Sequence, residues 1–411
     1  MRTIIFEDAG YVNLLPLVYA RATFDLRCGF DTLMDKIEAA FGQVADGLLV
    51  RPAIAAAVAE RQSRPVNQVP DDDDQLWVNG RLLVRRQFDL PKSAAAWRGD
   101  VLLAARIDAK TASRLAGKPP LDAATLGAAL ADCHKIELPT GAALLIEYPW
   151  QLVHQNESEI GRQFGAESGG VLGNLHDRAC LLNESAIHIG KGSNIKPTAV
   201  LDAEGGAICI AEDVTIGPHV TITGPCYIGD RCLIQPGANI AGSSLGTDCK
   251  VGGEVEASVF QGYSNKQHDG FLGHSYIGQW VNIGADTITS DLKNTYGSVR
   301  VPINGRLVDS AEMFVGSIIG DHTKTGINVG LPTGCVIGFA SNVFVSRYVP
   351  QFVPSFSWLI DSGLQTNDPQ RALAVARKVM ARRQRELTEV EEALFLAIVE
   401  EARGCEVRSG S

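Results

Sequence analysis

The fold is decided by residues 187–242, which read IHIGKGSNIKPTAVLDAEGGAICIAEDVTIGPHVTITGPCYIGDRCLIQPGANIAG. Isoleucine recurs there at an interval of six residues, at Ile210, Ile216, Ile222, Ile228, Ile234 and Ile240. A small or β-branched residue stands four positions after each of the first five isoleucines: Val214, Val220, Cys226, Cys232 and Ala238. Neither an α-helix nor an ordinary strand requires this spacing, because their side chains repeat with other periods.

The six-residue interval is the hexapeptide signature of a parallel β-helix, in which each turn directs an aliphatic side chain inward and places a compact residue at the corner. Gly217 and Gly229 directly follow their isoleucines, where a tight bend leaves little room for a Cβ atom. Three hexads form one coil of the left-handed version, so we predict a left-handed β-helix over residues 180–345. Such coils commonly associate as trimers, and we expect a homotrimer. The same interval begins earlier, at Ile189, Ile195 and Leu201, and returns after the stretch at Ile277, Ile283 and Ile337.

The chain on either side of the repeat has a different pattern. Residues 1–170 alternate short apolar runs, such as RTIIFED and DVLLAARI, with helical stretches such as GFDTLMDKIEAAFG, which predicts an α/β domain. For residues 346–411 we predict an extended linker at VPQFVPSFSW, followed by a helical tail. Asp368 and Pro369 are the expected cap and first residue of two short amphipathic helices.

Composition narrows the class of protein. The chain has 411 residues and a formal net charge of −10, which argues against a nucleic-acid binder because phosphate backbones require a basic face. Nine cysteines without a CxxC pair suit a reducing cytoplasm better than a disulfide framework, and Cys226 and Cys232 are interpreted as inert corner residues. No apolar run is long enough to span a membrane. We expect a cytoplasmic protein that acts on small molecules.

Three stretches resemble a known family: LLPLVYARATFDLRCG (14–29), VGGEVEASVFQGYSNKQHDGFLGHSYIGQWVNIGADTITSDLKNTYG (251–297) and IGDHTKTGIN (319–328). With the domain order, they resemble the bifunctional UDP-N-acetylglucosamine pyrophosphorylase / glucosamine-1-phosphate N-acetyltransferase family, more closely its divergent bacterial branch of sugar nucleotidyltransferases. The resemblance implies an acetyl-CoA-dependent acetyltransferase in the β-helix. It also implies a Rossmann-like nucleotidyltransferase domain at residues 1–170. Together they would serve UDP-N-acetylglucosamine synthesis for the cell envelope.

The resemblance implies roles around HDGFLG (268–273). In the family, a histidine three positions before an aromatic-Leu-Gly triplet is the acetyltransferase base, and His268 occupies that position. A histidine that titrates near neutrality can take the proton of an amino-sugar ammonium, so that the amine attacks the thioester of acetyl-CoA. Asn282 can hydrogen-bond the sugar or the tetrahedral intermediate. For His274, a structural hydrogen bond is the favoured interpretation.

Several positions depart from the family pattern. Phe271 stands where a tyrosine is usual, and Gln235 stands where relatives carry an arginine that grips the sugar phosphate. VEASVF (255–260) lacks the expected lysine. Because a phosphate requires cations, other basic residues must substitute if the substrate is an amino-sugar phosphate. The candidates are Lys250, Lys266 and Lys293.

His322 is the rival base. It lies between Asp321 and Lys324 in GDHTKTGIN, where a neighbouring carboxylate can orient an imidazole. Residues adjacent in sequence often point apart, however, so His268 is preferred.

The N-terminal domain is expected to be a weak or altered nucleotidyltransferase that uses UTP and Mg²⁺. Active relatives open with a glycine-rich loop, whose backbone N–H groups approach the triphosphate, whereas FEDAGYVNLL (6–15) has one glycine. Arg21, Arg27 and Lys36 are the candidate nucleotide-binding cations, and ordinary surface or ion-pair roles are equally favoured. The acidic residues that could bind Mg²⁺ are Glu7, Asp25 and the aspartates at 71–74. Glu7 and Asp25 lack the spacing of metal ligands, and the aspartates are interpreted as a solvated turn, so the metal ligands are unassigned.

Three functions stay open at this point. The first is acetyl transfer to an amino-sugar phosphate, and the second is nucleotidyl transfer to another sugar 1-phosphate. The third is a catalytically inactive trimeric scaffold or regulator. His268 supports the first, the domain order the second, and the missing cations the third.

Overall fold

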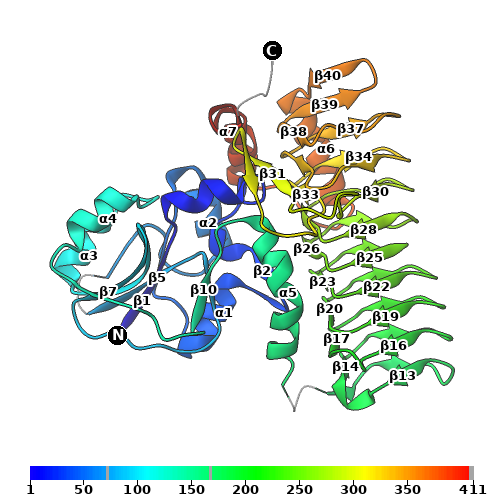
Figure 1. Ribbon diagram of the computed structural model, residues 1–411, viewed down its shortest axis with the longest axis horizontal. Helices are drawn as coiled ribbons and strands as arrows, with labels where there is room; N and C mark the ends of the chain where they lie inside the picture. The colour runs from blue at the N-terminus through cyan, green and yellow to red at the C-terminus, as the bar shows by residue number, and fades with distance from the viewer. Residues whose placement is uncertain (71–73, 166–168, 407–411) are drawn as a thin grey trace.

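The computed structural model describes residues 1–70, 74–165 and 169–406. Figure 1 shows an α/β domain beside a long stack of β-coils, with two C-terminal helices at one end of the stack. The N-terminal domain has a mixed six-stranded sheet in the order β4-β1-β5-β8-β7-β9, in which β1 pairs in parallel with β4 and β5. These strands are β4 (Gly47–Leu49), β1 (Arg2–Phe6), β5 (Gln75–Asn79), β8 (Val101–Ile107), β7 (Ala94–Arg98) and β9 (His134–Ile136).

Helices cover this sheet and connect it to the coils. Thr32 caps helix α1 by accepting a hydrogen bond from the backbone N–H of Asp35, and Gly42 ends this helix in a left-handed conformation. The helices are α1 (Leu33–Phe41), α2 (Pro52–Arg61), α3 (Ala109–Leu115), α4 (Ala123–Ala129) and α5 (Pro149–Gln163). Two small pairings complete the domain: β2 (Arg27–Cys28) with β3 (Asp31–Thr32), and β6 (Leu82–Val84) with β10 (Ala143–Leu145).

The coils form the predicted left-handed β-helix. Ile210 pairs with Ile228, eighteen residues later, so three hexads make one coil. The first face contains β11 (Gly170–Val171), β14 (Ile187–Ile189), β17 (Ile208–Ile210), β20 (Cys226–Ile228), β23 (Ser244–Leu245), β26 (Val259–Gly262), β29 (Tyr276–Gln279), β33 (Ile318–Ile319), β36 (Val336–Ile337) and β38 (Phe352–Val353). All six isoleucines of the repeat are fully buried in the interior of the coils, which confirms the inward position.

The other two faces stack in the same way. The second contains β12 (Asn174–Leu175), β15 (Asn194–Ile195), β18 (Thr215–Ile216), β21 (Leu233–Ile234), β24 (Lys250–Val251) and β27 (Asn265–Lys266), and above them β34 (Lys324–Thr325), β37 (Asn342–Phe344), β39 (Ser357–Ile360) and β40 (Gly363–Thr366). The third contains β13 (Cys180–Leu182), β16 (Val200–Asp202), β19 (Thr221–Thr223), β22 (Asn239–Ala241), β25 (Glu254–Glu256) and β28 (Phe271–Gly273), and, above these, the separate pair β30 (Ile288–Thr289) and β35 (Gly330–Leu331). A hairpin of β31 (Arg300–Ile303) and β32 (Arg306–Asp309) interrupts the upper coils.

The coils extend further than predicted at both ends. They begin at Gly170, and β38 and β39 continue them in parallel through the segment predicted to be an extended linker, after which β40 pairs antiparallel with β39. Val353 and Leu359 are buried in the coil interior, so this segment supplies inward side chains without the isoleucine interval.

The two predicted C-terminal helices are confirmed as α6 (Pro369–Ala381) and α7 (Glu389–Cys405). Asp368 caps α6 by accepting a hydrogen bond from the Arg371 N–H at 2.8 Å. Helix α7 packs against α2 of the N-terminal domain. One hydrophobic cluster therefore joins the sheet, the outside of the upper coils and both C-terminal helices. Within the described residues, no helix has the length and apolar character that crossing a membrane requires.

Candidate functional site

His268 lies in the turn between β27 and β28, on the outside of the β-helix. Its side chain is exposed, and in the part of the chain that the structure describes it has no hydrogen-bond partner. Its backbone oxygen, by contrast, accepts a hydrogen bond from Lys266 Nζ at 3.1 Å. The turn thus exposes the His268 imidazole, while the hydrogen bond from Lys266 holds its backbone.

Lys266 is the unusual residue of this region, because it points into the coil. Its in-register neighbours on the two preceding coils are Val251 and Ile234, both aliphatic plugs. The lysine is 1% exposed, and Nζ also donates to the oxygen of Gly252 at 2.8 Å. Burial lowers the pKa of the Lys266 ammonium to about 8. Among the described residues no carboxylate pairs with it, so a lone buried cation lies under the turn of His268.

The other predicted substrate residues lie at different distances from this turn. Gln235 Nε2 donates to Gln267 Oε1 at 3.4 Å, directly before His268. Asn282 is exposed on the next coil, where it forms a β-bridge with Asn265. Phe271 is half-buried on the third face. Lys293 is held away by a hydrogen bond from Nζ to the backbone oxygen of Ser298.

A basic group that the sequence analysis did not identify lies on the second face near Asn282. Arg383, just after α6, donates to Asn265 Oδ1 at 2.7 Å. Burial, together with the charges of Arg383 and Arg382, lowers the pKa of Lys250. Sequence reasoning could not bring these cations together, because the helical tail returns to the coils only in the folded chain.

His274 is held by other residues. Its Nδ1 is 2.8 Å from Asp291 Oδ2, and its ring stacks on Phe314 with centroids 4.9 Å apart. His154 of α5 lies beside it at 5.9 Å between ring centroids. The histidine therefore has a hydrogen-bonded position at the contact between α5 and the coils.

His322 is enclosed at the junction of the upper coils and α7. It is 8% exposed, and its ring lies against Phe339 and Phe395. Burial lowers the pKa of this imidazole well below its usual value, so it is neutral at pH 7. Asp321 does not orient it, because the Asp321 carboxylate binds a different residue.

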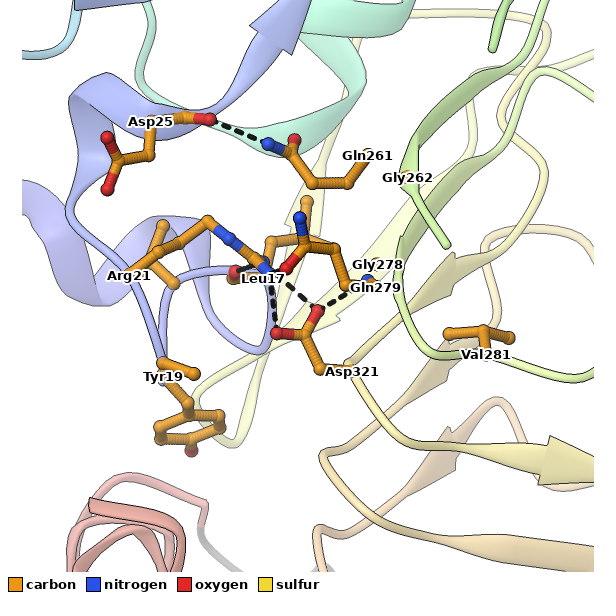
Figure 2. A network of polar contacts seen from close by, with 12 residues as sticks. Leu17, Tyr19, Arg21, Asp25, Gln261, Gly262, Gly278, Gln279, Val281 and Asp321 are labelled. Carbon is orange, nitrogen blue, oxygen red and sulfur yellow. Dashed lines mark hydrogen bonds and ion pairs between the residues drawn. The ribbon is translucent and has the colours of Figure 1, made fainter. Parts of the chain in front are cut away.

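That residue is Arg21 of the N-terminal domain, as Figure 2 shows. Its two terminal nitrogens lie 3.0 and 2.6 Å from the two oxygens of Asp321, and one also donates to Gln279 Oε1 at 3.1 Å. Both side chains of this ion pair are 4% exposed. A residue proposed to bind nucleotide therefore joins the N-terminal domain to the β-helix.

The three predicted nucleotide-binding cations are not brought together as a triphosphate site. Lys36 is buried against α5, with Nζ 2.7 Å from Gln163 Oε1 and 3.5 Å from Glu159 Oε2. The Arg27 guanidinium donates to the Phe30 carbonyl and lies over the Tyr227 ring. These three side chains are close in sequence but do not lie together, because each one packs against a different part of the structure.

Charges at the end of β1 are also paired internally. Glu7 Oε1 is 2.7 Å from Arg51 Nη1, and Asp8 Oδ2 is 2.5 Å from Arg81 Nη2. Asp25 lies apart, and burial raises its pKa to about 6. Glu7 is therefore not free to bind Mg²⁺, and no group of three metal-binding side chains occurs in the described chain. The aspartates at 71–73 lie outside the described residues.

Comparison with known proteins agrees with the two-part architecture. Residues 3–168 match the family model described as sugar nucleotidyl transferase. Residues 210–242 match the model described as bacterial transferase hexapeptide (six repeats). The chain thus has the domain composition of a transferase, a sugar nucleotidyl transferase domain followed by a hexapeptide β-helix.

Among characterised relatives, the chain is similar to bifunctional proteins. It is 33% identical over 102 residues to the bifunctional sugar-1-phosphate nucleotidylyltransferase/acetyltransferase of Sulfurisphaera tokodaii, covering 24% of this chain and 25% of that one. It is 35% identical over 135 residues to the bifunctional protein GlmU of Methanococcus vannielii, covering 32% and 31%. With GlmU of Synechococcus elongatus, 27% identity over 211 residues covers 47% and 42%. The matches thus span less than half of these relatives' length.

Proposed function

We propose that this chain is an acetyl-CoA-dependent N-acetyltransferase of an amino-sugar phosphate, with His268 as the base. The observation that carries the proposal is the His268 turn, where the imidazole is exposed, has no hydrogen-bond partner among the described residues, and belongs to a residue whose backbone oxygen is held by Lys266. The relatives named as bifunctional nucleotidylyltransferase/acetyltransferases support the class of reaction. The hexapeptide match supports the β-helix as the acyltransferase part.

The chemistry requires a neutral histidine and a held oxyanion. One nitrogen of His268 takes a proton from the substrate ammonium, and the freed amine attacks the thioester carbonyl carbon. The resulting tetrahedral oxyanion needs a hydrogen-bond donor, and Asn282, on the next coil beside Asn265, is the proposed donor. When the intermediate collapses, its nitrogen loses a second proton to solvent, the C–S bond breaks, and coenzyme A leaves as a thiol with the proton from His268, so that a neutral amide remains.

We assign the sugar phosphate to the second face of the β-helix. Gln235 stands where relatives carry a phosphate-binding arginine. Because a phosphate requires cations, other basic residues must bind it here. Lys250, Arg382 and Arg383 supply them close to Asn265 and Asn282. Substrate bound there would place its amine toward the His268 turn.

We also propose that the chain works as a homotrimer in the cytoplasm. The exposed turn at His268 leaves room for a neighbouring coil to close the site, as hexapeptide coils commonly associate in threes. Light scattering of the purified chain at micromolar concentration tests the assembly, and a monomer mass would contradict it.

The direct test of acetyl transfer follows release of free thiol from acetyl-CoA with glucosamine 1-phosphate as acceptor. Loss of a general base costs about 10²–10⁴-fold in rate, so His268→Ala should lose that much turnover. His274→Ala is the matched control, because His274 is bonded to Asp291 and lies beyond the triplet. If His268→Ala keeps wild-type turnover while His322→Ala loses it, His322 is the base.

Nucleotidyl transfer by the N-terminal domain is the second candidate, favoured by the match of residues 3–168. The Glu7–Arg51 and Arg21–Asp321 pairs leave these charges without a free position for a triphosphate, which supports a weak or altered site. Titrating the full chain with UTP and Mg²⁺ tests it. Tight binding with pyrophosphate release on adding a sugar 1-phosphate would contradict the view that the site is weakened.

A further inference from the structure

A cavity of about 290 Å³ lies where the N-terminal domain, the upper coils and the C-terminal helices meet. Its wall is made by side chains from all three parts, among them Arg27, Tyr263, Trp280, His322, Arg385 and Phe395. It lies near the Arg21–Asp321 pair, whose residues also line it (Figure 2). The volume is at the lower end of small-molecule sites, about 300 Å³, so the cavity is too small for acetyl-CoA.

Two buried polar atoms in this wall lack a partner among the described residues. His322 Nδ1 and Arg27 Nε are both buried and make no hydrogen bond. A buried donor or acceptor left without a partner is unfavourable, and such groups are rare unless a ligand or water satisfies them. The neutral imidazole offers an acceptor or a donor, and the guanidinium offers donors.

The charges of the wall leave a positive excess. Asp321 is bound to Arg21, and Glu391 is 3.1 Å from Arg61. The remaining acid is Asp25, and burial raises its pKa to about 6. Two arginines have no carboxylate partner in the described chain: Arg27 donates only to a carbonyl, and Arg385 lies over the Tyr263 ring at 5.6 Å. These two guanidinium groups suit a doubly charged oxyanion, for which arginine is the preferred protein ligand.

Aromatic rings form the rest of the wall. Tyr263 and Trp280 are stacked at 4.4 Å, and Trp280 is nearly parallel to His322 at 6.4 Å. Phe395 of α7 closes the opposite side. Flat apolar surfaces beside convergent donors are the usual composition of a metabolite site.

From these observations we infer that the junction cavity binds a small phosphate ester that carries hydroxyl groups. The phosphate lies against Arg27 and Arg385, and a hydroxyl group hydrogen-bonds His322 Nδ1. This site is distinct from the His268 turn, and the inference does not rest on the proposed acetyl transfer. Because all three parts of the chain contribute to the wall, a bound ligand holds the junction together and raises the thermal midpoint of unfolding.

Isothermal titration of the full chain with glucose 6-phosphate and with ribose 5-phosphate tests the inference, with glucose as the uncharged control. We expect saturable binding of at least one phosphate ester and none of glucose. Arg385→Gln should weaken binding at least about tenfold, as expected for loss of a charge-assisted contact. Lys378→Gln is the matched control, since Lys378 is exposed on the neighbouring helix α6 and does not line the cavity. Arg385 is itself exposed, so its substitution leaves folding intact.

Two further variants complete the test. His322→Phe keeps the ring and removes the acceptor, and should weaken binding while circular dichroism shows an intact fold. His268→Ala should bind like the wild type. The inference is overturned if no phosphate ester binds at millimolar concentration, or if Arg385→Gln and His322→Phe bind as well as the wild type. It is also overturned if His268→Ala alone abolishes binding, because the ester would then occupy the β-helix site.

Discussion

One corner of the β-helix has two different surfaces along its length. In the lower coils it carries Asp213, Arg231 and Asp248, and in the upper coils Tyr263, Trp280, His322 and Phe356. All seven residues have positive φ, between 50° and 60°, so the backbone geometry is the same throughout. The lower residues face solvent or are half-buried, whereas Trp280, His322 and Phe356 are buried under α7 and the N-terminal domain. The repeat thus sets the backbone and the inward residue, while the neighbouring domain selects what lies outside.

The largest effect on stability should come from the buried ion pair next to this corner. Arg21→Met leaves Asp321 buried without its partner, and breaking such a pair costs about 3–5 kcal/mol. Urea unfolding followed by circular dichroism measures the loss. A cost below about 1 kcal/mol would show that the junction does not depend on the pair.

The next effect concerns the lysine inside the coil. Lys266→Ile places an aliphatic side chain in the coil interior, as at the in-register positions Val251 and Ile234. Removing the buried charge should stabilise the fold by about 1–4 kcal/mol. The same variant loses the hydrogen bond to the His268 oxygen, so acetyl transfer should fall although stability rises. Unfolding and thiol-release assays on one preparation measure both. A variant that is more stable and fully active would remove Lys266 from any positioning role.

A smaller effect should appear in the pH dependence of stability. Burial lowers the pKa of Lys266 from 10.5 to about 8, so between these values the unfolded chain binds more protons at this site than the folded chain. The free energy of unfolding therefore gains a contribution that rises with pH across this window. Urea titrations at about pH 8 and about pH 9.5 should show the stability gap between wild type and Lys266→Met narrowing at the higher pH. A constant gap would contradict the depressed pKa.

The smallest effect should come from the exposed counterpart of the first pair. Arg231 is 2.9 Å from Asp248 at the same corner, but its side chain is 52% exposed. Arg231→Met should therefore cost less than about 1 kcal/mol by urea unfolding, as for other surface ion pairs. A cost equal to that of Arg21→Met would mean that burial is not what separates the two regions.

The sequence predicted the β-helix well and its ends less well. The isoleucine interval located the regular coils, because every inward position there is aliphatic. Strands β38 and β39, within residues 352–360, continue the coils without that interval, and Val353 and Leu359 supply their inward side chains. The isoleucine interval likewise did not predict that Lys266 points into the coil, which its in-register pairing with Val251 shows.

The candidate site was predicted in part. His268 was proposed from a local motif, and in the structure its imidazole is exposed and has no hydrogen-bond partner within the described part of the chain. Arg21 was a candidate for nucleotide binding or for an ion pair; the structure pairs it with Asp321, which is 300 positions away, and no local signal connects the two. Arg383 was missed for the same reason, because its contact with Asn265 spans 118 positions.

By itself, the sequence determined the inward pattern of the coils, the α/β character of the first domain, the two capped C-terminal helices and the histidine of the exposed turn. These features depend on neighbours within one or two coils or helical turns, where spacing along the chain translates directly into spacing in the molecule. Only the tertiary structure decided that Arg21 binds Asp321, that α7 covers the aromatic corner, and that His322 faces the junction cavity. Those contacts join segments that are far apart in the chain. Burial between the packed domains sets the charge of these residues and their access to ligand, and no local pattern encodes that burial.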